Sequence, residues 1–164
     1  MIREELKEKL ADAERILIGI GAEWKSGDAE REAMIAKAKD HLLELLKGKD
    51  YFVISTMEVD DVARLGFENG HTVVPFDVNL TEESWNNYTN WLSRTLNRKL
   101  VILELGEGFM QPTIIRWPFE KTVAINNKAC MYRVHKTFYQ ISDEIKEKAT
   151  AVKGDSVALF AEWN

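Results

Sequence analysis

The sequence predicts an α/β domain in which a mostly parallel sheet carries helices on both faces. Short continuous apolar runs alternate along the chain with segments in which apolar residues recur at helical spacing. Such runs are typical of parallel strands, because crossover helices cover both faces of their sheet. A chain of 164 residues, 45% of them apolar, has the size and apolar content of a single domain, residues 1–164.

Four apolar runs are predicted to be the strong strands, and the first of them is expected to be central. They are RILIGIG (15–21), YFVIST (51–56), LVILEL (100–105) and ACMYRVH (129–135). TVVPF (72–76) is weaker, and its Pro75 restricts it to an edge strand or a loop because proline lacks the N–H of a sheet ladder. A last strand is expected near ATAVK (149–153).

Helices are expected between these strands. Ile2, Leu6 and Leu10 recur among charges and predict an opening amphipathic helix that ends near Glu14. A long second helix is predicted after Ser26-Gly27-Asp28, with a stop at Lys47-Gly48. Its apolar face is expected to consist of Met34, Ile35, Ala38, Leu42, Leu45 and Leu46.

The remaining helices are shorter. EVDDVARLGF (58–67) and Ser142 to Lys148 are predicted as short helices, while Thr81 and Asp155 are expected to cap two others. Two prolines follow the third strong strand. Pro112 suits the first turn of the next helix, and Pro118 is expected to kink that helix or to end its regular part.

Composition narrows the classes of function. A net charge of -5 and a pI near 5.3 argue against a nucleic-acid surface, which needs clustered Lys and Arg. The single cysteine, Cys130, excludes an internal disulfide and any zinc site built from several thiolates. No run of apolar residues reaches membrane-spanning length, and the charged N-terminus does not resemble a signal peptide. We therefore expect a soluble, cytoplasmic protein.

The loops after Ile20, Ile54, Leu105 and Val134 are the candidate site. Ligands of parallel sheets bind beyond the carboxyl ends of the strands, where the strand order reverses. GIGAEW (19–24) has two of the glycines of a dinucleotide-binding turn, followed by Glu23 and Trp24. Two interpretations stay open: a phosphate-binding turn, or a tight turn whose glycines let strand and helix pack.

GEGF (106–109) poses a related question. Its glycines could present N–H groups to an anion, but Glu107 would stand beside that anion, and two like charges about 4 Å apart repel by about 1 kcal/mol even in water. Alternatively, Glu107 points to solvent. His135 ends a strand at the same edge, where it could contact a ligand or make a strand-end hydrogen bond, whereas His41 and His71 have no metal-ligand spacing.

Four segments, in order, resemble the NAD-binding domain of sirtuins, most closely the bacterial sirtuins linked to macrodomains. They are ADAERILIGIGAEWKSG, YFVISTMEVDDVARLGF, LELGEGFMQPTIIRWPFE and ACMYRVHKTFYQISDEI. The resemblance implies a Rossmann-like sheet of sirtuin topology without the small zinc-binding module, so no zinc is expected. It also implies NAD or ADP-ribose as the ligand. The implied contacts are Gly19, Gly21, Ala22, Glu23, Trp24, Lys25, Thr56, Met57, Gly106, Glu107, Gly108 and His135.

The chain departs from the sirtuin pattern at nucleotide-facing positions. Glu23 and Lys25 stand where the family has a glycine and a serine, and Met57 stands in place of the catalytic asparagine. Met110 and Gln111 replace an Asn-Thr pair. These differences predict a catalytically inactive domain that binds a nucleotide or a protein partner.

Two alternatives remain. One is a residual NAD-consuming enzyme, either a glycohydrolase or an ADP-ribosyltransferase, that uses Glu23, Glu107 or His135 as acid or base. The other is a structural module that forms a homodimer through tryptophans. The aromatic group of Trp85, Tyr88 and Trp91 is expected to lie in the core or in such a dimer contact.

Overall fold

The protein, described by a computed structural model over residues 1–163, contains a six-stranded sheet in which every neighbouring pair of strands is parallel. The strands are β1 (Arg15–Ile20), β2 (Tyr51–Ser55), β3 (Thr72–Val73), β4 (Leu100–Leu105), β5 (Cys130–His135) and β6 (Ala149–Lys153). Their order is β3-β2-β1-β4-β5-β6, which reverses direction between β1 and β4. This is a Rossmann-like α/β fold, as the sequence predicts.

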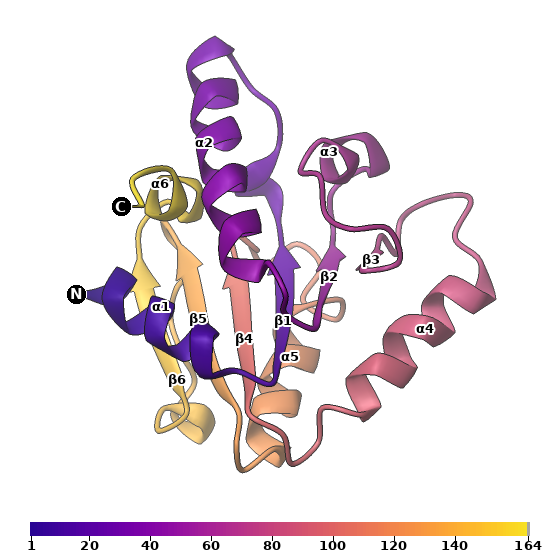
Figure 1. Ribbon diagram of the computed structural model, residues 1–164, viewed down its shortest axis with the longest axis vertical. Coiled ribbons are helices and arrows are strands. Elements are labelled where there is room, and N and C mark those ends of the chain that lie inside the picture. The colour runs from indigo at the N-terminus through magenta and orange to yellow at the C-terminus, as the bar shows by residue number, and fades with distance from the viewer. Residues whose placement is uncertain (164) are drawn as a thin grey trace.

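Helices cover both faces of the sheet. They are α1 (Ile2–Asp12), α2 (Ala29–Leu46), α3 (Val59–Ala63), α4 (Glu82–Ser93), α5 (Arg116–Ile125) and α6 (Ser156–Ala161), with single 3₁₀ turns η1 (Ala22–Trp24) and η2 (Asp143–Ile145). Figure 1 shows α1, α2 and α6 on one side of the sheet and α5 on the other. No helix within residues 1–163 has both the length and the apolar character needed to cross a membrane.

Two apolar cores result, one on each face. In β1, Ile16, Ile18 and Ile20 pack on the side of α1, α2 and α6, while Leu17 packs on the side of α4 and α5. The same alternation runs through β4, where Leu103 faces the first core and Ile102 the second. The central strands β1 and β4 thus place apolar side chains on both faces, which is why they read as continuous apolar runs.

Most of the predicted helix boundaries are confirmed. Asp28, Thr81 and Asp155 each cap a helix, their side chains accepting from the backbone N–H of Arg31, Ser84 and Val157. TVVPF supplies the two-residue edge strand β3, which ends before Pro75. The segment from 142 to 148 holds only the 3₁₀ turn η2.

The prediction for Pro118 is wrong. Turns occupy residues 112–115, so the regular helix α5 begins at Arg116 and Pro118 lies in its first turn. The first N–H groups of a helix have no intrahelical acceptor, so a proline there removes nothing. The helix continues unbroken to Ile125.

The aromatic group on α4 is divided between core and surface. The ring of Tyr88 is buried 5.3 Å from that of Phe52, and the Phe52 ring lies 5.7 Å from that of Trp91. Trp85 remains 38% exposed, and on α5 Trp117 is 54% exposed. The core role of Tyr88 is confirmed, while a dimer contact through the exposed tryptophans stays a prediction.

Candidate functional site

The two glycine-containing loops, GIGAEW (19–24) after β1 and GEGF (106–109) after β4, lie against each other at the point where the strand order reverses. Because β1 and β4 are parallel neighbours, the loops that follow them leave the same edge of the sheet. The N–H of Gly21 donates to Leu105 O at 3.0 Å, and the N–H of Gly106 donates to Val134 O at 2.8 Å. The loops after β1, β4 and β5 therefore form one hydrogen-bonded unit.

The glycines at this edge allow the backbones to approach closely. A Cβ on Gly21 would lie 2.6 Å from Glu107 Cα and 2.6 Å from Gly106 O. Gly106 has φ of +71°, and a Cβ there would lie 2.5 Å from Glu23 Cβ. The space beside both glycines is thus filled by the protein itself, which favours the packing interpretation of these turns over the phosphate-binding one.

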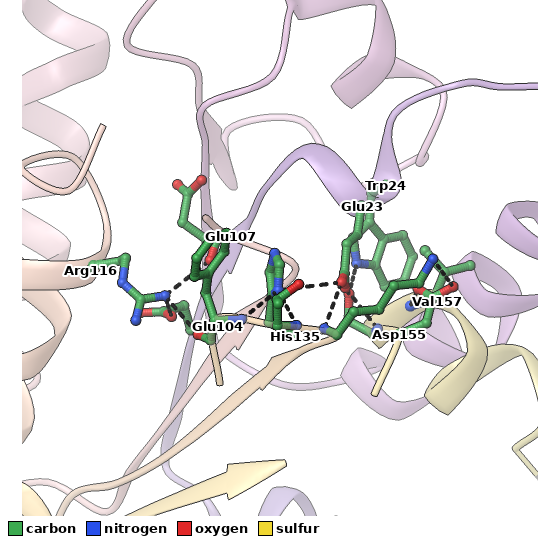
Figure 2. A network of polar contacts seen from close by, with 12 residues as sticks. Glu23, Trp24, Glu104, Glu107, Arg116, His135, Asp155 and Val157 are labelled. Atoms are coloured by element: carbon green, nitrogen blue, oxygen red, sulfur yellow. Dashed lines mark hydrogen bonds and ion pairs between the residues drawn. The ribbon is translucent and has the colours of Figure 1, made fainter. Parts of the chain in front are cut away.

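The carboxylate of Glu23 is held by hydrogen bonds from Ser156 and from the backbone of Lys136. Its Oε1 accepts from the N–H of Ser156 at 2.9 Å and from Ser156 Oγ at 2.6 Å, and its Oε2 accepts from the N–H of Lys136 at 2.9 Å. Figure 2 shows this carboxylate between the end of β5 and the beginning of α6. An internal carboxylate thus uses the backbone donors of this corner.

Trp24 and Arg31 are held at the same corner as Glu23. Trp24 is 1% exposed and donates from Nε1 to Ser156 Oγ at 2.9 Å. Arg31 of α2 donates to Glu23 O and forms an ion pair with Asp155. Burial opposes the ionisation of Asp155, but the hydrogen bonds from Arg31 and the N–H of Val157, together with the charges of Arg31 and Lys136, outweigh it and lower the pKa of Asp155.

His135 accepts hydrogen bonds at the end of β5. Its Nδ1 lies 2.9 Å from the N–H of Thr137 and 2.9 Å from that of Phe138. These contacts place the proton of the neutral ring on Nε2, so Nδ1, 3.7 Å from Glu23 Oε2, does not donate to that carboxylate. Burial lowers the pKa of His135 and outweighs the opposing effect of Glu23. The predicted strand-end hydrogen bond is present.

A buried ion-pair cluster lies beneath the loops. Glu104 of β4 accepts from Arg133 of β5 at 2.6 Å and 3.0 Å, and from Arg116 of α5 at 3.3 Å. Arg133 also contacts Glu120 at 2.9 Å. Two carboxylates and two guanidinium groups thus balance one another inside the protein, as a buried charge cluster requires.

Arg116 connects this cluster to the loops above it. Its Nη1 donates to Glu107 O at 3.1 Å and to Phe138 O at 3.0 Å, and its guanidinium carbon lies 4.2 Å from the ring centroid of Phe109. A single side chain, 2% exposed, therefore holds the loops after β4 and β5 in place.

Glu107 is buried, so the interpretation that it points to solvent is wrong. It is 5% exposed, and its Oε1 accepts from Thr56 Oγ1 at 3.0 Å. Its Oε2 is covered and has no hydrogen-bond partner among residues 1–163. Burial raises the pKa of Glu107 to about 7, although the hydrogen bond from Thr56 opposes the shift. Figure 2 shows its carboxylate apart from the dashed contacts that join Arg116 to Glu104.

A cavity of about 570 Å³ opens beside Glu107 at this edge of the sheet. Aromatic rings form part of its wall, with the centroids of Phe109 and Phe138 6.0 Å apart in an edge-to-face arrangement. The lining residues are Ala22, Thr56, Phe76, Glu107, Gly108, Phe109, Met110, Gln111, His135 and Phe138. Large apolar cavities with a few polar groups are the usual sites of small ligands.

The structure brings some of the predicted contact residues together and separates others. Ala22, Thr56, Glu107, Gly108 and His135 line the cavity. Glu23 and the glycines Gly21 and Gly106 lie beside it in contacts within the protein, and Lys25 is exposed.

The other predicted contacts lie in the core. Trp24 and Met57 belong to the core on the α1, α2 and α6 side. A Cβ on Gly19 would lie 2.6 Å from Ile115 and 2.7 Å from Phe119, so Gly19 allows β1 to pack closely against α5 and the residue that precedes it. None of the three faces the cavity.

Several lining residues were not among the predicted contacts. Phe76, Phe109 and Phe138 lie outside the helices and strands and line the cavity. In the sequence, the feature that points to these residues is that aromatic side chains are concentrated close to the carboxyl ends of the predicted strands. Met110 and Gln111, the departures from the sirtuin pattern, also lie here.

The described residues contain no group of three or more His, Cys, Asp or Glu side chains that could hold a metal ion. No protein-family model matches the chain, and no curated protein matches it.

Replacing Glu23 by alanine is expected to destabilise the fold by about 1–3 kcal/mol, because the N–H groups of Ser156 and Lys136 lose their acceptor. Urea denaturation followed by circular dichroism measures the change. The matched control is Glu8→Ala at an exposed position of α1, which is expected to change the free energy of unfolding by less than about 0.5 kcal/mol. Equal effects of the two substitutions would contradict the assigned role.

Glu107 is expected to make the protein less stable as pH rises. The native pKa of about 7 lies above the ordinary value of 4.5, so the native state binds the proton more tightly, and this stabilisation is lost between about pH 4.5 and pH 7. The loss amounts to about 2–3 kcal/mol. Urea denaturation at pH 5 and pH 8 tests it: Glu107→Gln should remove this part of the pH dependence. If the free energy of unfolding changed with pH by the same amount in the wild type and in Glu107→Gln, the raised pKa of Glu107 would be refuted.

Proposed function

We propose that the domain binds the ring end of a nucleotide-like small molecule in this cavity, without catalysing a reaction. The observation that carries the proposal is the cavity of about 570 Å³ at the reversal of strand order, lined by a buried carboxyl group with one unpaired oxygen. Sites for small ligands typically measure about 300–1,000 Å³ and combine apolar walls with a few directed polar groups. The position agrees with the rule for open parallel sheets.

The walls of the cavity suit a planar ring. Phe76, Phe109 and Phe138 remain 50%, 52% and 42% exposed, and Met110 is 94% exposed. Aromatic faces bind flat heterocycles by stacking, at about 1–3 kcal/mol per base. A flexible thioether adapts to ligands of different shape. These exposed apolar side chains gather around one opening, so a bound ring would shield them from water.

The phosphate arrangement implied by the sirtuin resemblance does not fit this site. The backbone donors of Ser156 and Lys136 are used by Glu23, and Gly21 is packed on the backbone of Glu107. A pyrophosphate would have to displace a carboxylate that accepts three hydrogen bonds. The proposed ligand therefore enters with its base or nucleoside part, and any phosphate group stays toward solvent.

The absence of catalysis is supported by the position of Met57. The resemblance matches this residue with the catalytic asparagine of sirtuins, but its side chain belongs to the apolar core. A thioether has no N–H to donate and accepts hydrogen bonds only weakly. It would not orient water or a ribose hydroxyl as an amide does.

Isothermal titration with adenosine, nicotinamide, NAD, ADP-ribose and cyclic ADP-ribose tests the proposal. At least one of these ring-bearing compounds is expected to bind, and Phe138→Ala should weaken that binding by roughly tenfold or more because a stacking face is lost. The control is Leu96→Ala, in the separate groove between α4 and α5, which should leave affinity unchanged. A flat response to all five compounds would overturn the proposal and favour the protein-partner alternative.

A second candidate function follows from the protonation of Glu107. A carboxyl group with a pKa of about 7 exchanges its proton readily near neutral pH, as a general base must. In this alternative, Glu107 removes a proton from water, the water oxygen forms a bond to the ribose C1′ of NAD, and the bond from C1′ to nicotinamide breaks. Nicotinamide leaves with the electron pair of that bond, and the other product is ADP-ribose.

Chromatographic assay of nicotinamide released from NAD distinguishes this alternative. Release by the wild type that falls about 10²–10⁴-fold in Glu107→Gln would support it. Glu144→Gln, an identical change at an exposed position of η2, is the control and should not alter the rate. No release at high protein concentration would eliminate the enzymatic alternative.

A further inference from the structure

Among residues 1–163, no cation forms an ion pair with Glu107, and its Oε2 has no hydrogen-bond donor. Beneath it, Glu104 and Glu120 are balanced by Arg116 and Arg133. Arg116 directs Nη1 to the backbone oxygen of Glu107 rather than to its carboxylate. The only side-chain donor to the carboxylate among the described residues is the neutral hydroxyl of Thr56.

The charged groups around Glu23 and Asp155 also have their own partners and make none of their contacts with Glu107. Arg31 pairs with Asp155, and Glu23 accepts from Ser156 and from the backbone of Lys136. Their side chains make no hydrogen bond to the carboxylate of Glu107 within residues 1–163. The charge of an ionised Glu107 is therefore left for a ligand to balance.

The lining of the cavity has the same character. Of the described residues that line it, none is Lys or Arg, and the only polar side chains are those of Thr56, Glu107, Gln111 and His135. Aromatic faces, whose π-electrons attract cations, make up much of the remainder. An anionic ligand would meet a carboxylate here, whereas a cation would meet both a carboxylate and aromatic rings.

We propose that the cavity selects a planar cationic or amino-bearing heterocycle that donates two N–H groups to the carboxylate of Glu107. This inference rests on the proposed function. A carboxylate oxygen accepts two hydrogen bonds, so Oε1 has capacity beyond its contact with Thr56, and the covered Oε2 accepts from none of the described residues. Paired N–H donors match the two oxygens of a carboxylate in one plane. The ligand thereby supplies a partner to the buried oxygen that the protein leaves without one.

This recognition depends on pH because the donors bind the ionised carboxylate. Binding should strengthen as pH rises through the pKa of Glu107, and near neutral pH it should release a proton. The titratable and charged groups that face Glu107 are Glu104 of β4, Arg116 of α5, His135 at the end of β5 and Glu23 of η1. A Glu107→Gln variant retains all four, so its comparison with the wild type isolates Glu107.

Three probes of the same size test the inference on the wild-type protein. Benzamidine is a cation with paired N–H donors, benzamide is neutral with an amide group, and benzoate is an anion with acceptors only. Nuclear magnetic resonance titrations, followed through the backbone amide signals of Thr56, Gly108 and Phe138, give the three affinities. Benzamidine is expected to bind roughly tenfold or more tightly than benzamide, and benzoate most weakly.

The same titrations on two variants assign the selectivity. Glu107→Gln should remove the preference for benzamidine and its dependence on pH between pH 5.5 and pH 8, while Glu144→Gln should keep both. Benzamide or benzoate binding as tightly as benzamidine, or an unchanged preference in Glu107→Gln, overturns the inference while the cavity remains a ligand site. Failure of all three probes to perturb these signals overturns the inference and counts against the proposed function as well, which the titration with nucleotides then decides separately.

Discussion

The arrangement of the site depends on the pairing of one buried carboxylate in a central strand. Glu104 faces α5 from the middle of the sheet, where a charge without partners would cost several kcal/mol. Arg133 from the neighbouring strand and Arg116 from α5 supply those partners. Because Arg116 also donates to two loop carbonyl groups, the requirement to pair Glu104 fixes the walls of the cavity above it. Burial thus determines where the loops lie.

The two glycine-containing loops show how one backbone framework can accept a different chemistry. Their strands, turns and helices lie where a dinucleotide-binding sheet would have them, but the side chain of Glu23 fills the corner and the carboxylate of Glu107 lies at the cavity. Both are acids at positions where phosphate binding needs donors. Two acids therefore occupy an edge at which phosphate binding would require hydrogen-bond donors.

The sheet could be predicted from the sequence because its signals are local. Continuous apolar runs identified the strands, and polar residues before helices identified the caps at Thr81 and Asp155. For the site, the sequence predicted the edge of the sheet at which it lies but not the contacts of its side chains. The burial of Glu107 depends on Thr56, 51 residues away, and the partners of Glu23 lie 113 and 133 residues away. One feature of the sequence does point to the buried ion pairs. The acid in LVILEL, Glu104, and the arginine in ACMYRVH, Arg133, lie side by side in the register of the parallel strands β4 and β5.

The contacts of Glu23 and Trp24 with Ser156 join the first loop of the sheet to its last helix, across 133 and 132 residues of chain. Contacts of such long sequence separation carry the largest loop-closure entropy, and they form late when a chain emerges from the ribosome. The corner next to the cavity is therefore incomplete until α6 docks. Local opening of this six-residue helix would release the carboxylate of Glu23 and expose Trp24 together, so the integrity of the cavity rim is tied to the end of the fold farthest from it in sequence.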